Sequence, residues 1–238
     1  MSDREHPPEH SGETITIYKV DPILDTGVVV TSAGQAPDGR LDDRHSAYHD
    51  NISPPLEWTD VPGAMSWAVI VEDPDAPQTQ PFVHWMIWNI EGGITALPAG
   101  LPNAERLVTP QGAVQGRNSM HGHGWFGPRP PQGHGMHRYY FQVFALDASI
   151  PMGPETPLPE LLNALKGRTL ASGEMMATYE APETKPEEDF RYRTEGGGGG
   201  KGRAGGGDDD PARNARLRGE RPSPSDRERG EGSIADRT

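Results

Sequence analysis

Short stretches of alternating apolar and polar positions recur through most of the chain. They are rich in β-branched and aromatic residues, which is typical of strands buried on at least one face. The pattern predicts six strands, over residues 15–20, 28–31, 66–71, 83–90, 138–146 and 174–179. Leucines at helical spacing, an early proline and a terminal Gly167 predict one helix over residues 159–166. Many strands, one helix and connections rich in proline and glycine predict an all-β sandwich or barrel.

The periodic pattern is confined to residues 14–182. Residues 1–13 are polar and charged, and residues 183–238 are dominated by glycine, arginine and acidic residues. Segments of this composition cannot bury enough apolar surface to offset the entropy lost on ordering. We therefore expect a disordered arm (1–13), one folded domain (14–182) and a disordered tail (183–238).

Charge and composition narrow the classes of function. The chain of 238 residues has a net charge of −13, and residues 1–182 contain ten lysines and arginines against 22 acidic residues. This acidic excess argues against nucleic-acid binding by the folded domain. The absence of cysteine excludes disulfides, thiolate zinc sites and a cysteine nucleophile. No apolar run reaches the ~18 residues of a membrane span, and the polar start lacks a secretion signal, so we expect a cytoplasmic protein.

Two acidic residues follow one of the predicted strands. Asp73 and Asp75 are two positions apart, so in an extended chain both carboxylates lean to the same side. They are candidates for ligand binding. The alternative is a polar turn in which the side chains cap backbone amides.

Three aromatic or imidazole side chains on predicted strands are further candidates. Alternation places His84 on one face with Met86 and Trp88, and it places His137 and Tyr139 on a common face. The stretch before His137 is stiffened by prolines, and exposed amides in such a turn can form an anion-binding nest. The alternatives are a structural histidine and an ordinary loop.

Several other motifs fail on inspection. The segment 122–127 matches a dinucleotide-binding fingerprint, but the prolines after it exclude the helix that must follow. No phosphate-binding loop of the GxxxxGK[ST] type and no GxSxG nucleophile turn occurs. Four histidines stand in glycine-rich loops without a recognised metal-site spacing: His121, His123, His134 and His137. We therefore expect neither a metal site nor a cofactor.

Taken together, the motifs resemble one family. NISPPLEW at 51–58, DPDAP at 73–77, HW at 84–85, GRN at 116–118 and GPRPP through HRY at 127–139 occur in the order and spacing of the phosphatidylethanolamine-binding protein family, in its bacterial Raf-kinase-inhibitor-like branch. The resemblance implies two antiparallel sheets with Greek-key connections and a small anion-binding pocket at one end. The pocket residues that it implies are Asp73, Asp75, His84, Pro128, Arg129, Pro130, His137 and Tyr139.

The chain departs from the family pattern at one pocket position. Relatives often have cysteine in the GPRPP turn, where this chain has Arg129. A guanidinium turned inward would hold an anion through two parallel hydrogen bonds, whereas one turned outward would only decorate the surface.

These observations favour a binding module for a small anion such as phosphate, carboxylate or a phospho-head-group. The resemblance further suggests a kinase or other phosphoprotein partner and a homodimer. The alternative is a hydrolase of small phosphate or acyl esters that uses the His and Asp residues. We expect the Asp carboxylates to accept hydrogen bonds from His84 or His137 and to favour imidazolium, so that anion binding tightens as the pH falls through about 6.5.

Overall fold

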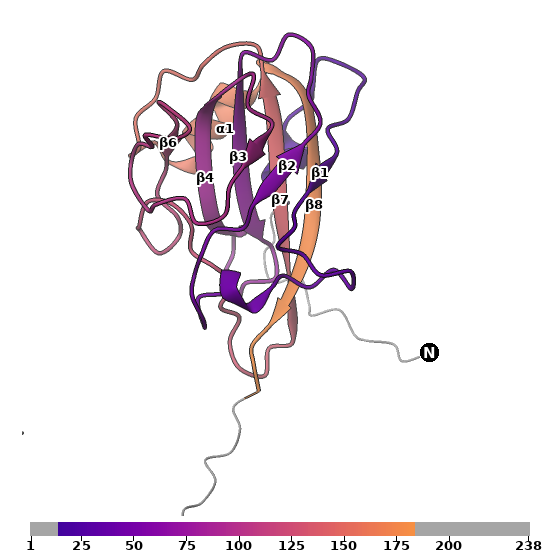
Figure 1. Cartoon of the computed structure of the whole chain (residues 1–238), viewed down its shortest axis with the longest axis vertical. Coiled ribbons are helices and arrows are strands. Elements are labelled where there is room, and N and C mark those ends of the chain that lie inside the picture. Colours follow the sequence, from indigo (N-terminus) through magenta and orange to yellow (C-terminus); the bar gives the residue numbers. More distant parts are fainter. Residues whose placement is uncertain (1–13, 184–238) are drawn as a thin grey trace, which may run out of the picture. The chain divides into compact units, whose positions relative to one another are not determined.

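Two antiparallel sheets form the domain, and the computed structural model describes residues 14–183 (Figure 1). The large sheet has five strands in the order β6-β4-β3-β7-β8, and the small sheet has three in the order β1-β2-β5. The strands are β1 Val30–Thr31, β2 Leu56–Trp58, β3 Ser66–Asp73, β4 Phe82–Glu91, β5 Ala96–Leu97, β6 Val114–Gln115, β7 Met136–Leu146 and β8 Thr169–Glu180. The helices are α1 Leu158–Leu165 and two 3-10 turns, Thr16–Lys19 and Asp43–His45. The predicted fold class is confirmed. The expected arm (1–13) and all but the first residue of the expected tail (183–238) lie outside the described residues.

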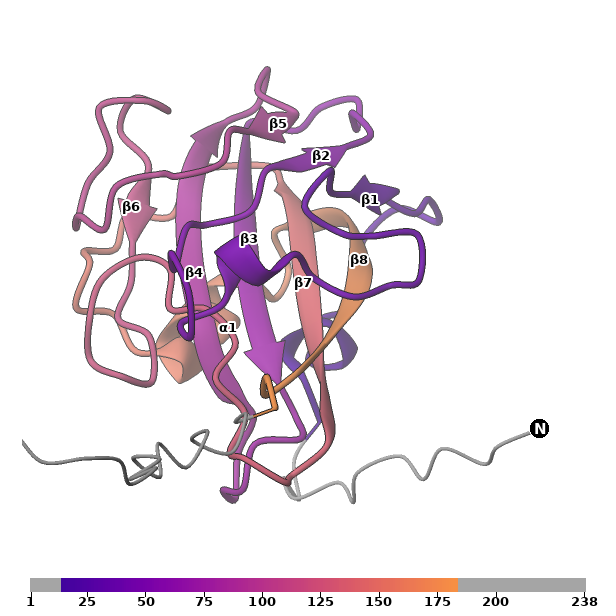
Figure 2. The ribbon, with the colours of Figure 1, turned by 60° about the horizontal axis from the view of Figure 1, so that its bottom comes forward.

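The large sheet has a hydrophobic core on each face. On one face, Trp67, Val69 and Val71 of β3 pack with residues of the small sheet. On the other face, Ala68 and Ile70 pack with the leucines of α1. Figures 1 and 2 show this layering, with the small sheet and α1 on opposite sides of the large sheet. Every residue of β3 is buried, because it is the central strand between two covered faces. Within residues 14–183, no helix has the length and apolarity that crossing a bilayer requires.

One predicted strand is wrong. Within residues 15–20, Thr16–Lys19 form a 3-10 turn, although the β-branched composition of the segment predicted a strand. The amide of Thr16 donates to the buried carboxylate of Glu72 at 2.7 Å, and the amide of Ile17 donates to the Gln142 side chain at 2.6 Å. These bonds to the large sheet satisfy the backbone groups that a strand neighbour would otherwise pair, so tertiary contacts override the local propensity.

Two β-bulges in β4 change which way its side chains point. Val71 pairs with Trp85 while its neighbour Glu72 pairs with Val83, so His84 is the extra residue in the ladder. A second shift follows near Asn89, whose φ of 58° lies in the left-handed region. A bulge re-aims the side chains around it. The expected common face of His84, Met86 and Trp88 is therefore wrong.

Replacing Gly173 with alanine should destabilise the fold by about 2 kcal/mol, because overpacking at rigid backbone has this cost. A Cβ at this position of β8 would lie 1.7 Å from the carbonyl oxygen of Val28, whose amide donates to Ser172. Gly153→Ala is the matched control, because nothing lies within 4 Å of a Cβ there. Urea denaturation of both variants measures the difference. Equal urea midpoints for the two variants would contradict the close packing of the Val28 backbone on β8.

Candidate functional site

A cavity of about 290 Å³ lies at one end of the large sheet. Because neighbouring strands are antiparallel, the end of β3 adjoins the beginnings of β4 and β7 there. Figure 2 shows the loop from β3 to β4 and the loop into β7 at this end. The lining residues are Asp73, Ala76, Pro77, Gln78, Phe82, His84, Met120, Phe126, Arg129, Pro130, Pro131 and His137.

Asp73 and His137 form a buried hydrogen-bonded pair in this lining. The Oδ2 of Asp73 lies 2.8 Å from Nδ1 of His137, and its Oδ1 accepts from the amide of Asp75 at 2.7 Å. A carboxylate accepts, so Nδ1 of His137 carries a proton. The Nε2 of His137 lies 2.9 Å from Nδ1 of His134, so the hydrogen-bonded series continues from Asp73 through His137 to His134. Both Asp73 oxygens are therefore already engaged.

Asp75 does not line the cavity. It is fully buried and forms a forked ion pair with Arg138, with distances of 2.6 Å from Nη2 to Oδ1 and 2.8 Å from Nε to Oδ2. The Arg138 amide also donates to Oδ2 at 2.9 Å. The Asx turn at Asp73 takes the backbone out of the extended geometry that would align the two carboxylates. The polar-turn alternative thus describes this pair, and Asp75 fixes the start of β7.

His84 is buried and has no carboxylate partner. Its Nδ1 donates to the carbonyl oxygen of Phe126 at 2.5 Å, so of the two histidines expected to pair with an Asp, His137 does so with Asp73 and His84 does not. Burial is the main cause that lowers the pKa of His84, although Asp73 and the Phe126 carbonyl oppose the shift. The free protein therefore holds this ring neutral, with an unprotonated Nε2.

Tyr139 packs behind His84, with ring centroids 5.1 Å apart in an edge-to-face arrangement. It shares a face of β7 with His137, as the alternation predicted. Its hydroxyl is buried and has no hydrogen-bond partner among residues 14–183. Burial raises the pKa of Tyr139 well above its usual value, so the hydroxyl stays protonated. A buried unsatisfied hydroxyl is costly, and such groups cluster at functional sites.

The proline-rich turn is anchored to residues 46–51, which sequence reasoning did not connect to the site. The carbonyl of Pro128 accepts from the Ser46 hydroxyl at 2.9 Å, and the carbonyl of Pro130 accepts from the Tyr48 hydroxyl at 2.5 Å. Pro128 is therefore an anchor outside the cavity lining, whereas Pro130 forms part of the wall. The exposed Arg129 lines the cavity, and its guanidinium lies 5.8 Å from the centre of the Tyr48 ring.

The cavity wall is mostly apolar. Phe82 and Phe126 lie beside the His84 ring, at centroid distances of 4.6 and 6.2 Å. Met120 also lines the cavity. These wall residues carry no motif signal, because apolar residues in loops are common in any sequence.

Comparisons with known proteins give a consistent result. A family model described as phosphatidylethanolamine-binding protein matches residues 31–180. A UPF0098 protein of Methanothermobacter thermautotrophicus is 41% identical over 142 residues, which cover 59% of this chain and 91% of that protein. The crystal structure of Escherichia coli YbcL, described as a member of the mammalian PEBP family, matches with a TM-score of 0.61 and 34% identity over 66% of this chain and all of that one. A PEBP homologue of Chlamydia trachomatis, CT736, matches with a TM-score of 0.58 and 32% identity, over 66% of this chain and 99% of its own.

Replacing Asp75 with asparagine should destabilise the domain by about 3 kcal/mol, because it leaves Arg138 without its buried counter-charge. Asn keeps the volume of the side chain, so the variant isolates the loss of charge. Asp147→Asn is the matched control on an exposed residue of the same type. Chemical denaturation measures both. Equal free energies of unfolding would show that the ion pair does not hold the start of β7.

Proposed function

Because the chain belongs to the phosphatidylethanolamine-binding protein family, we propose that its cavity binds a small anionic group, such as a phosphate or a carboxylate. One observation supports this most directly: the cavity gathers Arg129, His84 and His137 around a single carboxylate, Asp73, whose two oxygens are already engaged. These groups, rather than the acidic excess of the whole domain, therefore determine the charge at the opening of the cavity.

Three groups are placed to receive the anion. The guanidinium of Arg129 is always charged and can offer two parallel donors. His84 offers Nε2, which becomes a donor once the ring takes up a proton. His137 offers Nε2, which lies 2.9 Å from His134 in the free protein and donates to an anion only when it carries a proton. The apolar walls strengthen each of these interactions by excluding water.

The size and walls of the cavity define the ligand further. About 290 Å³ is at the small end of ligand sites, which suits a head group or one modified side chain and excludes acyl chains. Two sources share this chemistry: the head group of a phospholipid, after which the family is named, and a phosphorylated residue of a partner protein. The proposed chemistry is binding without turnover, because the lining described here contains no hydroxyl or thiol that could attack an ester.

The full chain should bind phosphate and O-phosphoethanolamine at one saturable site, and Arg129→Gln should weaken both by about tenfold or more, as expected for the loss of a charge-assisted pair. Isothermal titration calorimetry measures the affinities. Arg44→Gln is the matched control, because Arg44 is exposed and does not line the cavity.

Equal weakening in both arginine variants would assign the effect to general charge and contradict the cavity site. Release of inorganic phosphate from O-phosphoethanolamine by the wild type would contradict binding without turnover. Vesicles containing phosphatidylethanolamine and a phosphotyrosine peptide, compared in the same titration, distinguish the two sources of ligand.

The affinity for sulfate should rise as the pH falls, because a bound anion raises the pKa of the His84 ring, which burial otherwise lowers. Binding then takes up a proton at Nε2. The affinity begins to rise as the pH falls through the pKa that His84 has in the complex. It stops rising once the pH is below the lower pKa that His84 has in the free protein. Sulfate keeps its charge over this range, so titrations between about pH 8 and pH 5 report on the protein alone.

His84→Gln should flatten this pH dependence, whereas the exposed His49→Gln should leave it unchanged. A wild-type affinity that stays constant with pH would contradict the coupling to a proton. The same slope in His84→Gln as in the wild type would show that His84 is not the group that takes up the proton.

A further inference from the structure

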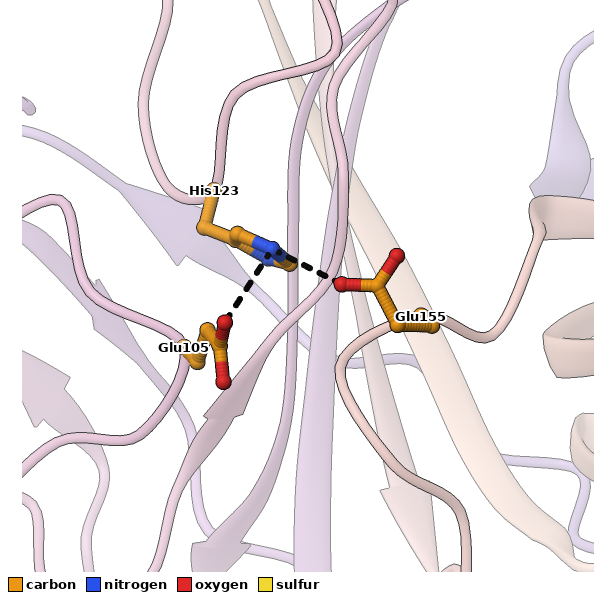
Figure 3. Close-up of side chains that lie close together, drawn as sticks. All are labelled: Glu105, His123 and Glu155. Atoms are coloured by element: carbon orange, nitrogen blue, oxygen red, sulfur yellow. Dashed lines mark ion pairs between the residues drawn. The ribbon is translucent and has the colours of Figure 1, made fainter.

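A second cluster of polar side chains lies outside the anion cavity and shares no residue with it. Figure 3 shows His123 between Glu105 and Glu155, each on a different loop. The Nε2 of His123 lies 3.2 Å from Oε1 of Glu155 and 3.8 Å from Oε1 of Glu105. We propose that these three residues bind a divalent transition-metal ion, with zinc as the ion to test.

The tautomer of His123 is the first argument. Its Nδ1 lies 3.0 Å from the carbonyl oxygen of Gln115, which can only accept, so Nδ1 carries a proton. In the neutral ring, Nε2 then presents a lone pair toward two carboxylates. Metal-binding histidines commonly have this arrangement, in which a backbone carbonyl holds one ring nitrogen and the metal occupies the other.

The direction of Nε2 is the second argument. This atom is buried, and no oxygen among residues 14–183 lies in a direction that satisfies a hydrogen bond, even though one Glu155 oxygen is 3.2 Å away. The ring and the Glu155 carboxylate therefore lie at ion-pair distance without hydrogen-bond alignment. A metal ion sits between its ligands at about 2.0–2.2 Å from each, which brings ligand atoms to separations of this order without hydrogen bonds between them. The 3.8 Å from Nε2 to Glu105 is also within the separation that two ligands of one metal ion can have.

Hydrogen bonds from Arg117 and Gln115 hold the three proposed ligand residues in place. Arg117 donates to both oxygens of Glu155, at 2.6 and 2.9 Å, and so fixes the position of that carboxylate. The backbone of Gln115 links Glu105 to His123. Its N–H donates to the backbone carbonyl of Glu105 at 2.9 Å, and its backbone carbonyl lies against Nδ1 of His123. The Gln115 side chain is in turn fixed by Trp85. Such outer contacts orient metal ligands.

The ligand set indicates the class of metal. One imidazole nitrogen and two carboxylates suit zinc, cobalt or nickel, whereas calcium and magnesium prefer oxygen ligands alone. Three protein ligands leave at least one position for water or another ligand. Sequence patterns do not reveal this site, because Glu105 and Glu155 are far apart along the chain and neither lies near a histidine in a recognised spacing.

The full chain, stripped with a chelator, should bind one zinc ion in calorimetry and give a visible absorption band with cobalt. His123→Gln and Glu105→Gln should each lower the zinc affinity by about tenfold or more. His121→Asn is the matched control: it removes an exposed histidine of the same loop, and Asn tolerates its φ of 64°. Glu105 is exposed, so its variant keeps the test valid if His123→Gln does not fold.

Two results would overturn the proposal. The first is an affinity that both His123→Gln and Glu105→Gln leave unchanged. The second is zinc binding that is lost instead in His134→Ala, or in a variant without His6 and His10, since either loss would place the metal on other histidines of the chain.

Discussion

The hydrogen bond between Asp73 and His137 is the constraint on which the site depends. It joins the end of β3 to the start of β7 where the sheet ends, and it gives Asp73, the one carboxylate of the cavity lining within residues 14–183, a permanent partner. Asp75 is neutralised separately by Arg138. Two acidic residues beside an anion site would otherwise repel the ligand. With both carboxylates engaged, Arg129 and the histidines set the electrostatics of the opening.

The bulge at His84 is the second constraint. An unbroken β4 would turn this ring toward Met86 and Trp88 and the core under α1. The extra residue instead turns it toward Tyr139 and the cavity, where the Phe126 carbonyl fixes its orientation. Burial then keeps the ring neutral until a ligand supplies negative charge. The backbone irregularity thus decides how this histidine can respond to an anion.

Sequence patterns predicted the long strands well, because β3, β4 and β7 are buried along their length and carry strong apolar signals. They missed β2, β5 and β6, which are too short for any periodicity. The shared face of His137 and Tyr139 follows from simple alternation, whereas the face of His84 depends on a bulge that no local pattern reveals. The placement of Asp75 with Arg138, and the meeting of Glu105, His123 and Glu155, are products of tertiary packing. Residue identity and spacing cannot predict such contacts.

The affinity of Asp73→Asn for sulfate, measured by calorimetry against the wild type, tests the role of Asp73 most directly. If the carboxylate holds the His137 ring in position through its Nδ1, the neutral variant should bind sulfate more weakly, although a negative charge has been removed from the cavity. If Asp73 were simply a charge that repels the ligand, the variant should bind more tightly. Tighter binding in a folded Asp73→Asn protein would contradict the account.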